Sequence, residues 1–180
     1  MRVLAVAGGL HPYSVNHRLL HALSELFPAG TDIVTPPVGL DTLPYYTEEF
    51  DGDDAPEGVR LWRHAVAAAS ALLVATPEYN GSMPGVLKNA IDLASRPRGT
   101  AALLGVPAAV AAASPNPTAA RYAREHLALV LDIAGALVQP VTFGVGNAYE
   151  VVTARGFTDP AVAAEARDFI AALVHQARRV

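Results

Sequence analysis

The sequence predicts an α/β fold, a three-layer sandwich in which helices cover both faces of a five-stranded parallel sheet. Short apolar runs of strand length alternate along the chain with longer segments whose apolar residues recur at helical spacing. Five such strand–helix units permit the doubly wound strand order 2-1-3-4-5, in which ligands bind where the winding direction reverses. With 180 residues we expect a single domain, 1–180.

The elements are expected in the following order. The strands are the apolar segments 2–7, 31–35, 71–75, 106–113 and 137–143. The first helix follows Ser14, a suitable N-cap, and carries an apolar stripe of Leu19, Leu20, Leu23, Leu26 and Phe27. The remaining helices are expected over 57–70, 83–95, 118–136 and 159–179. The connection 36–56 is too long for an ordinary loop, and we expect it to be functional or mobile.

Composition and charge exclude several functions. A net charge of −4 gives no overall attraction to nucleic acid or to an anionic membrane surface, so we expect neither as a partner. The chain has no cysteine, so a redox function would have to use a bound cofactor. The longest apolar runs, 65–75 and 101–113, are interrupted and too short for a spanning helix, and the first residues do not resemble a signal peptide. The sequence therefore predicts a cytoplasmic protein.

Two segments leave the carboxyl ends of the strands on either side of the winding reversal. The first, 8–16, contains Gly9, His11, Ser14 and Asn16 and ends at a helix N-terminus, which suits a phosphate. A capped strand–helix turn would have the same composition. The second, 76–83, contains Pro77, Glu78, Tyr79, Asn80 and Gly81 and could wrap a flat ring, although Tyr79 could equally be an exposed loop residue. Neither segment is a Walker loop or a nucleophile elbow.

The second segment also carries a longer pattern. Residues 77–92 read P-E-Y-N-x-x-x-P-G-x-L-K-N-A-x-D, and Leu43-Pro44-Tyr45-Tyr46 follows the second strand. On these motifs the chain resembles the NADPH-dependent FMN reductase family of flavodoxin-like quinone, azo-dye and chromate reductases over nearly its whole length.

The resemblance implies a flavodoxin-like fold, FMN and NAD(P)H as cofactors, and a homodimer or homotetramer. By resemblance the FMN-binding residues are Gly9, His11, Ser14 and Asn16 at the phosphate and Pro77, Glu78, Tyr79, Asn80, Gly81 and Ser114 near the ring. Tyr46 and Tyr79 are candidate walls of the acceptor pocket, and backbone donors would stabilise negative charge on the reduced ring.

The phosphate segment departs from the family pattern. The family usually has G-S-x-R-x-x-S-x-N, where this chain has Gly-Gly-Leu-His-Pro-Tyr-Ser-Val-Asn at 8–16, so His11 stands in the place of an arginine. After the fourth strand, 114–118 lacks the glycines that the family usually has there. The other histidines, which have no metal-ligand spacing and indicate no metal site, are His17, His21, His64, His126 and His175.

The sequence therefore favours an enzyme that passes hydride from NAD(P)H through FMN to a quinone-like or other small-molecule electron acceptor. No side chain is assigned to acid–base catalysis. Two alternatives remain, an FMN-binding electron carrier and a family member whose flavin binding is weak or lost and which acts as a binding protein.

Overall fold

Two strands with apolar side chains on both faces, β1 (Arg2–Ala7) and β3 (Ala71–Ala75), form the centre of the sheet in the computed structural model of the chain, which describes residues 1–11, 13–52, 54–153 and 156–180. The remaining strands are β2 (Asp32–Val34), β4 (Pro107–Ala113), β5 (Leu137–Val138), β6 (Phe143–Val145), β7 (Val152–Thr153) and β8 (Gly156–Phe157). The helices are α1 (Val15–Ser24), α2 (Glu57–Ala67), α3 (Gly85–Ala94), α4 (Arg121–Ile133), α5 (Ala148–Val151) and α6 (Pro160–Ala177), with 3-10 helices η1 (Leu40–Thr42) and η2 (Glu48–Asp51).

The predicted strand order is confirmed. The sheet runs β2-β1-β3-β4-β5, and all its pairs are parallel. Leu4 lies opposite Leu72 and Leu72 opposite Ala108, so the three central strands are in close register. The winding direction reverses between β1 and β3, whose carboxyl ends therefore border the crevice where ligands bind in this topology.

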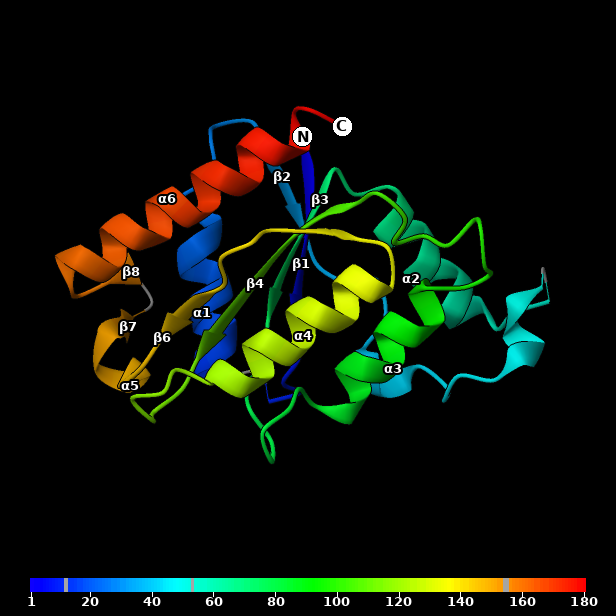
Figure 1. Cartoon of the computed structure of the whole chain (residues 1–180), viewed down its shortest axis with the longest axis horizontal. Coiled ribbons are helices and arrows are strands. Elements are labelled where there is room, and N and C mark those ends of the chain that lie inside the picture. The colour runs from blue at the N-terminus through cyan, green and yellow to red at the C-terminus, as the bar shows by residue number, and fades with distance from the viewer. Residues whose placement is uncertain (12, 53, 154–155) are drawn as a thin grey trace.

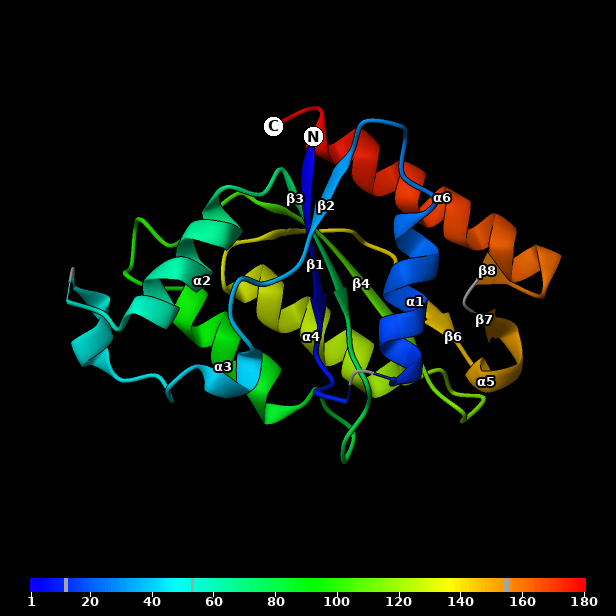
Figure 2. The same cartoon turned by 180° about the vertical axis from the view of Figure 1, so that it is seen from behind.

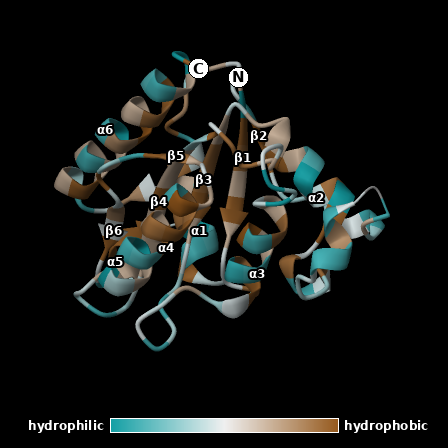
Figure 3. Ribbon diagram, turned by 45° about the vertical axis from the view of Figure 1, so that its right-hand side comes forward, coloured by the Kyte–Doolittle hydropathy of each residue, from teal (hydrophilic) through white to brown (hydrophobic). Residues whose placement is uncertain are grey.

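Alternating strand side chains divide the interior into two apolar layers. Leu4, Val6 and their neighbours face α2, α3 and α4, whereas Val3, Ala5 and their neighbours face α1 and α6. Figure 1 and Figure 2 show these two helical layers on opposite faces of the sheet, with both termini at the end away from the crevice. Figure 3 shows the strands as the most hydrophobic part of the ribbon. No helix in the described part of the chain has the length and apolarity needed to span a bilayer.

The predicted bounds of the fifth strand are wrong. Instead of one strand over 137–143, β5 and β6 form separately, and both pair with β4. Pro140 lies between them and has no N–H to donate, so the parallel ladder stops after Gln139 donates to Ala108. The antiparallel pair β7–β8 and the short helix α5 follow and were not predicted.

Several helix boundaries also differ from the prediction. The helix α1 does begin after Ser14, but it ends at Ser24, so Leu26 and Phe27 lie beyond it. The helix α4 begins at Arg121 because Ala119 and Ala120 adopt left-handed backbone conformations. The long connection after β2 contains η1 and η2, and Phe50 packs against the core, so its acidic part is not wholly solvated. Pro12, in the predicted phosphate segment 8–16, and Asp53, in the connection 36–56, lie outside the described residues.

Candidate functional site

A cavity of about 600 Å³ opens at the carboxyl ends of β1 and β3, where the sequence predicted a crevice. Both predicted loops contribute to it. It is lined by Gly8, Leu10, His11, Tyr79, Pro84, Gly85 and Val86. The loops also lie close together, since a Cβ added at Gly9 would come within 3.5 Å of the ring of Pro77. A cavity of this size is within the range that small-molecule cofactors occupy.

The β1–α1 loop is held against the sheet by backbone contacts. Gly8 donates its N–H to the carbonyl oxygen of Ala75 at 2.8 Å, and a Cβ at Gly8 would lie only 2.7 Å from Leu87. A side chain at Gly8 would therefore require Leu87 to move. Gly9 lines a neighbouring cavity of about 490 Å³, which it shares with His17.

The N-terminus of α1 provides donors beside the loop. Ser14 is the N-cap, and its Oγ accepts the N–H of His17 at 3.3 Å, while the first N–H groups of a helix have no partner within it. The ring Nε2 of His17 lies 3.1 Å from the carbonyl oxygen of Gly9, so this histidine fixes the loop rather than lying free on the surface. No pattern in the sequence indicates that role.

His11 is exposed and borders the cavity. Its Nδ1 accepts the backbone N–H of Tyr13 at 3.3 Å, which leaves Nε2 as the nitrogen able to donate to a ligand. This arrangement fits the prediction that His11 substitutes for an arginine at a phosphate.

The side chain of Asn16 has a different role from the predicted one. It is buried and bonds to both backbone groups of Ala113, donating to the carbonyl oxygen at 3.0 Å and accepting the N–H at 2.8 Å. It therefore joins α1 to the end of β4 and does not face the cavity. Only the backbone N–H of Asn16 remains for an anion.

The β3–α3 segment forms a tight two-residue turn. Tyr79 and Ser82 exchange backbone hydrogen bonds of 2.8 and 3.1 Å, with Asn80 and Gly81 at the tip. Both tip residues have positive φ, 53° and 76°, for which an Asn-Gly pair is the preferred sequence. The N–H of Tyr79 is therefore not available to a ligand, whereas its side chain lines the cavity with 58% of its surface exposed.

Glu78 is oriented away from the cavity by a contact with α4. Its Oε2 accepts the backbone N–H of Ala123 at 3.2 Å, in the first turn of that helix. Burial lowers the pKa of the neighbouring Arg124, an effect that Glu125 and, more weakly, Glu78 oppose. This contact gives the carboxylate of Glu78 a structural role that the sequence alone did not indicate.

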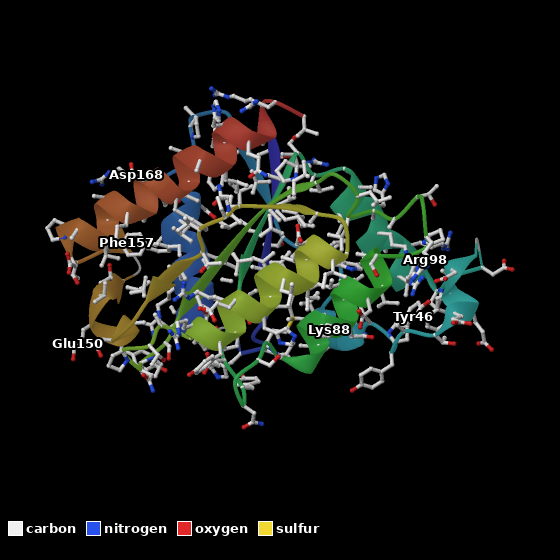
Figure 4. All side chains as sticks on the ribbon, in the orientation of Figure 1. Tyr46, Lys88, Arg98, Glu150, Phe157 and Asp168 are labelled. Atoms are coloured by element: carbon white, nitrogen blue, oxygen red, sulfur yellow. The ribbon has the colours of Figure 1, made fainter. Side chains whose placement is uncertain are left out.

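Tyr46 and Ser114 lie outside the cavity lining. The backbone N–H of Tyr46 bonds to Asn89, its hydroxyl donates to Asp51 at 3.3 Å, and Arg96 lies over its ring. Partial desolvation raises the pKa of Tyr46, and Arg96 opposes this shift. Figure 4 shows Tyr46 near Arg98, on the side of the α2–α3 layer. Ser114 accepts the N–H of Asn116 through its Oγ, donates its backbone N–H to Val145 at the end of β6, and accepts the N–H of Ala148 at the start of α5.

The N-terminus of α3 completes the cavity, and prediction from the residues did not single it out. Pro84, Gly85 and Val86 line the cavity, and α3 has no side-chain cap. A Cβ at Gly85 would meet no atom within 4 Å, so the helix end faces open space. The signal was present, because Pro84 and Gly85 are the P-G of the 77–92 pattern.

This chain is similar to a protein-family model in sequence and to solved structures in fold. The family model described as NADPH-dependent FMN reductase matches residues 1–150. The chain belongs to this family. Among solved structures, the flavoenzyme NAD(P)H:(acceptor) oxidoreductase from Paracoccus denitrificans has a TM-score of 0.87 to this FMN reductase family member, at 31% identity, covering 99% of this chain and 97% of that chain.

Curated relatives agree with the family assignment. A 2-hydroxy-1,4-benzoquinone reductase from a Burkholderia species is 41% identical over 127 residues, which are 71% of this chain and 68% of that protein. A quinone reductase from Pseudomonas putida is 42% identical over 114 residues, which are 63% of this chain and 60% of that protein. The predicted family and fold are thus confirmed, and this FMN reductase family member is a flavin-dependent NAD(P)H oxidoreductase with FMN and NAD(P)H as cofactors.

The residues present fit FMN. The cavity has the size for a cofactor, His11 and Tyr79 border it, and the uncapped end of α3 also lies there. Bound FMN would supply the hydride and electron chemistry that links the nicotinamide to an acceptor. The chain itself would hold the FMN phosphate near the start of α1 and place Tyr79 beside one face of the flavin ring. Its role is to position the cofactor rather than to transfer a proton.

Proposed function

We propose that the protein reduces small quinone-like acceptors with NAD(P)H at the cavity between the β1–α1 loop and the Tyr79–Ser82 turn. The observation that carries the proposal is the single cavity that residues of both loops line at the winding reversal of the sheet. In the overall reaction a quinone gains a hydride equivalent from NAD(P)H and a proton from water, and becomes a hydroquinone, while NAD(P)H becomes NAD(P)⁺.

The substrate class is inferred from two lines of support. Relatives about 40% identical to this chain are named quinone reductases. The exposed ring of Tyr79 also gives the cavity a flat aromatic border, against which a planar acceptor can stack. We propose that Gly9, His11, Ser14 and the backbone of Asn16 hold the phosphate.

We also propose that Pro77, Tyr79, Asn80 and Gly81 border the ring, with Ser114 on its far side. For Glu78 we propose an indirect role, which is argued in the next subsection. Tyr46 does not line the cavity of its own chain, so we propose that it reaches an acceptor pocket only across a subunit contact.

We propose a homodimer or homotetramer. Three large apolar side chains on α4 are exposed, with Tyr122 at 54%, Leu129 at 55% and Ile133 at 76% of their surface accessible. Such a row along one helix is the kind of surface that association of copies would bury. A single domain over 1–180 and a cytoplasmic location stay predictions from the sequence.

One experiment separates the enzyme from its alternatives. Purified protein is titrated with FMN while its absorption spectrum is recorded, and NADPH oxidation is then followed with and without 1,4-benzoquinone. The proposal expects FMN binding and quinone-dependent NADPH oxidation. FMN binding without NADPH oxidation would identify an electron carrier, and absence of FMN binding would identify a member that has lost its flavin.

A further inference from the structure

The Tyr79–Ser82 turn projects from the sheet and needs support from elsewhere. Its tip residues Asn80 and Gly81 are exposed, and more than half of the Tyr79 surface is accessible. The hydrogen bonds between Tyr79 and Ser82 fix the shape of the turn but not its position above the cavity. Each of its two ends also contacts α4.

The first contact is made by Glu78 at the start of the turn. The helix α4 begins without a side-chain cap of its own, after Ala119 and Ala120, which both have φ near 50°. Glu78 supplies the missing acceptor by taking the N–H of Ala123 at 3.2 Å. A carboxylate there also faces the positive end of the helix dipole.

The second contact is made by Ser82 at the end of the turn. Its Oγ lies 2.8 Å from Nδ1 of His126. Ala123 and His126 are three residues apart on α4 and therefore lie on the same side of the helix. The turn is thus fastened to one helix at both of its ends, before Tyr79 and after Gly81.

We propose that Glu78 is a positioning residue, which together with Ser82 and His126 clamps the ring-bordering turn to α4 and acts on FMN only through the placement of Tyr79. This inference rests on the proposed function in one respect, the location of the flavin ring beside Tyr79. The clamp itself is a property of the chain without FMN, so it can be tested separately.

The test compares Glu78→Ala, Glu78→Gln and Ser82→Ala with a matched control, Glu125→Ala. Glu125 carries the same charge near the start of α4, is exposed, and does not contact the turn. In FMN-free protein, hydrogen exchange at the Ala123 amide should speed up in Glu78→Ala. Exchange there should stay slow in Glu78→Gln, because the glutamine amide oxygen can still accept, and in the Glu125 control.

FMN binding supplies the second readout. We expect the FMN dissociation constant to rise about tenfold in Glu78→Ala, about threefold at most in Glu78→Gln, and not at all in Glu125→Ala. The absorption bands of bound FMN should shift in Glu78→Ala and Ser82→Ala, because Tyr79 moves relative to the ring.

Two results would overturn the inference. Unchanged FMN affinity and unchanged Ala123 exchange in Glu78→Ala would show that there is no clamp. Equal loss of affinity in Glu78→Gln and Glu78→Ala, with normal Ala123 exchange in Glu78→Gln, would show that the carboxylate acts on the cofactor directly. If the wild type itself binds no FMN, the proposed function fails, and the exchange measurements alone then decide whether the clamp exists.

Discussion

The side chain of Asn16 and the backbone of Ala113 pair through two hydrogen bonds, of 3.0 and 2.8 Å, inside the protein. Through this pair the first turn of α1 is tied to the last residue of β4, which lies two strands away from β1 in the sheet. The start of α1, where we place the phosphate, therefore has a fixed position relative to Ser114, which follows Ala113.

Replacement of Asn16 by alanine should destabilise the protein. It leaves the N–H and carbonyl groups of Ala113 buried without these partners, at about 1–3 kcal/mol each. We expect the free energy of unfolding of the FMN-free protein, measured in urea, to fall by about 2–4 kcal/mol. Asn16→Asp serves as the control, since its carboxylate can accept the N–H but repels the carbonyl oxygen. A loss under about 0.5 kcal/mol in Asn16→Ala would contradict the structural role.

Substitutions in the turn should affect flavin and not folding. Tyr79→Ala removes an exposed ring, so we expect weaker FMN binding with a nearly unchanged melting temperature. Asn80→Gly keeps the positive φ and removes only the side-chain amide, whereas Asn80→Ala also strains the turn. The comparison therefore separates turn geometry from amide contact. Wild-type FMN affinity in all three variants would exclude the turn from the site.

Replacement of His11 by arginine should strengthen FMN binding. His11 is exposed, so His11→Arg and His11→Ala should leave stability unchanged. An arginine fork that reaches the phosphate should tighten FMN binding by on the order of 1–2 kcal/mol. His11→Ala should weaken FMN binding relative to the wild type, because it removes the ring Nε2 that borders the cavity. Equal FMN affinity in the wild type and in His11→Ala would show that α1 and Ser14 hold the phosphate without His11.

Alanine should lower the stability of the protein at Gly8 but not at Gly9. At Gly8 the new Cβ would lie 2.7 Å from Leu87, so we expect a loss of about 1–3 kcal/mol of unfolding free energy. At Gly9 the nearest atom would be 3.5 Å away, an ordinary contact, so stability should be retained. Thermal or urea unfolding of both variants provides the measurement, and equal destabilisation would refute the distinction.

The exposed row on α4 should control association. Ile133→Glu places a charge at the most exposed apolar side chain of that row, and we expect it to lower the molar mass found by light scattering after size exclusion. Glu165→Gln, on the opposite helical layer, is the matched control. A wild-type mass in Ile133→Glu would move the subunit contact to another surface.

Most of the fold could be predicted because it depends on patterns that extend over many residues. The apolar runs at β1, β3 and β4 and the N-cap Ser14 are local signals, and the structure confirms them. The apolar run 137–143 predicts one strand, but Pro140 within it has no N–H for the ladder and divides it in two. The late start of α4 depends on two alanines in left-handed conformations, for which alanine gives no sequence signal.

The loops of the candidate site could be predicted from the sequence, but the contacts of its individual side chains could not. The sequence located both segments that line the cavity and the residues His11 and Tyr79 within them. The partners of Asn16 and Glu78 are 97 and 45 residues away, and single-sequence patterns contain no information on such pairings. These polar side chains satisfy backbone groups of the fold, and from sequence they resemble ligand-binding residues.

The break at Pro140 also affects how copies of the chain can associate. It divides one outer strand into segments of two and three residues, and the opposite outer strand, β2, has only three. A long, regular outer strand invites pairing with another chain, which can lead to aggregation, whereas short or interrupted ones discourage it. Continuation of the sheet from one copy into the next is therefore disfavoured on both sides, and association is left to the helices.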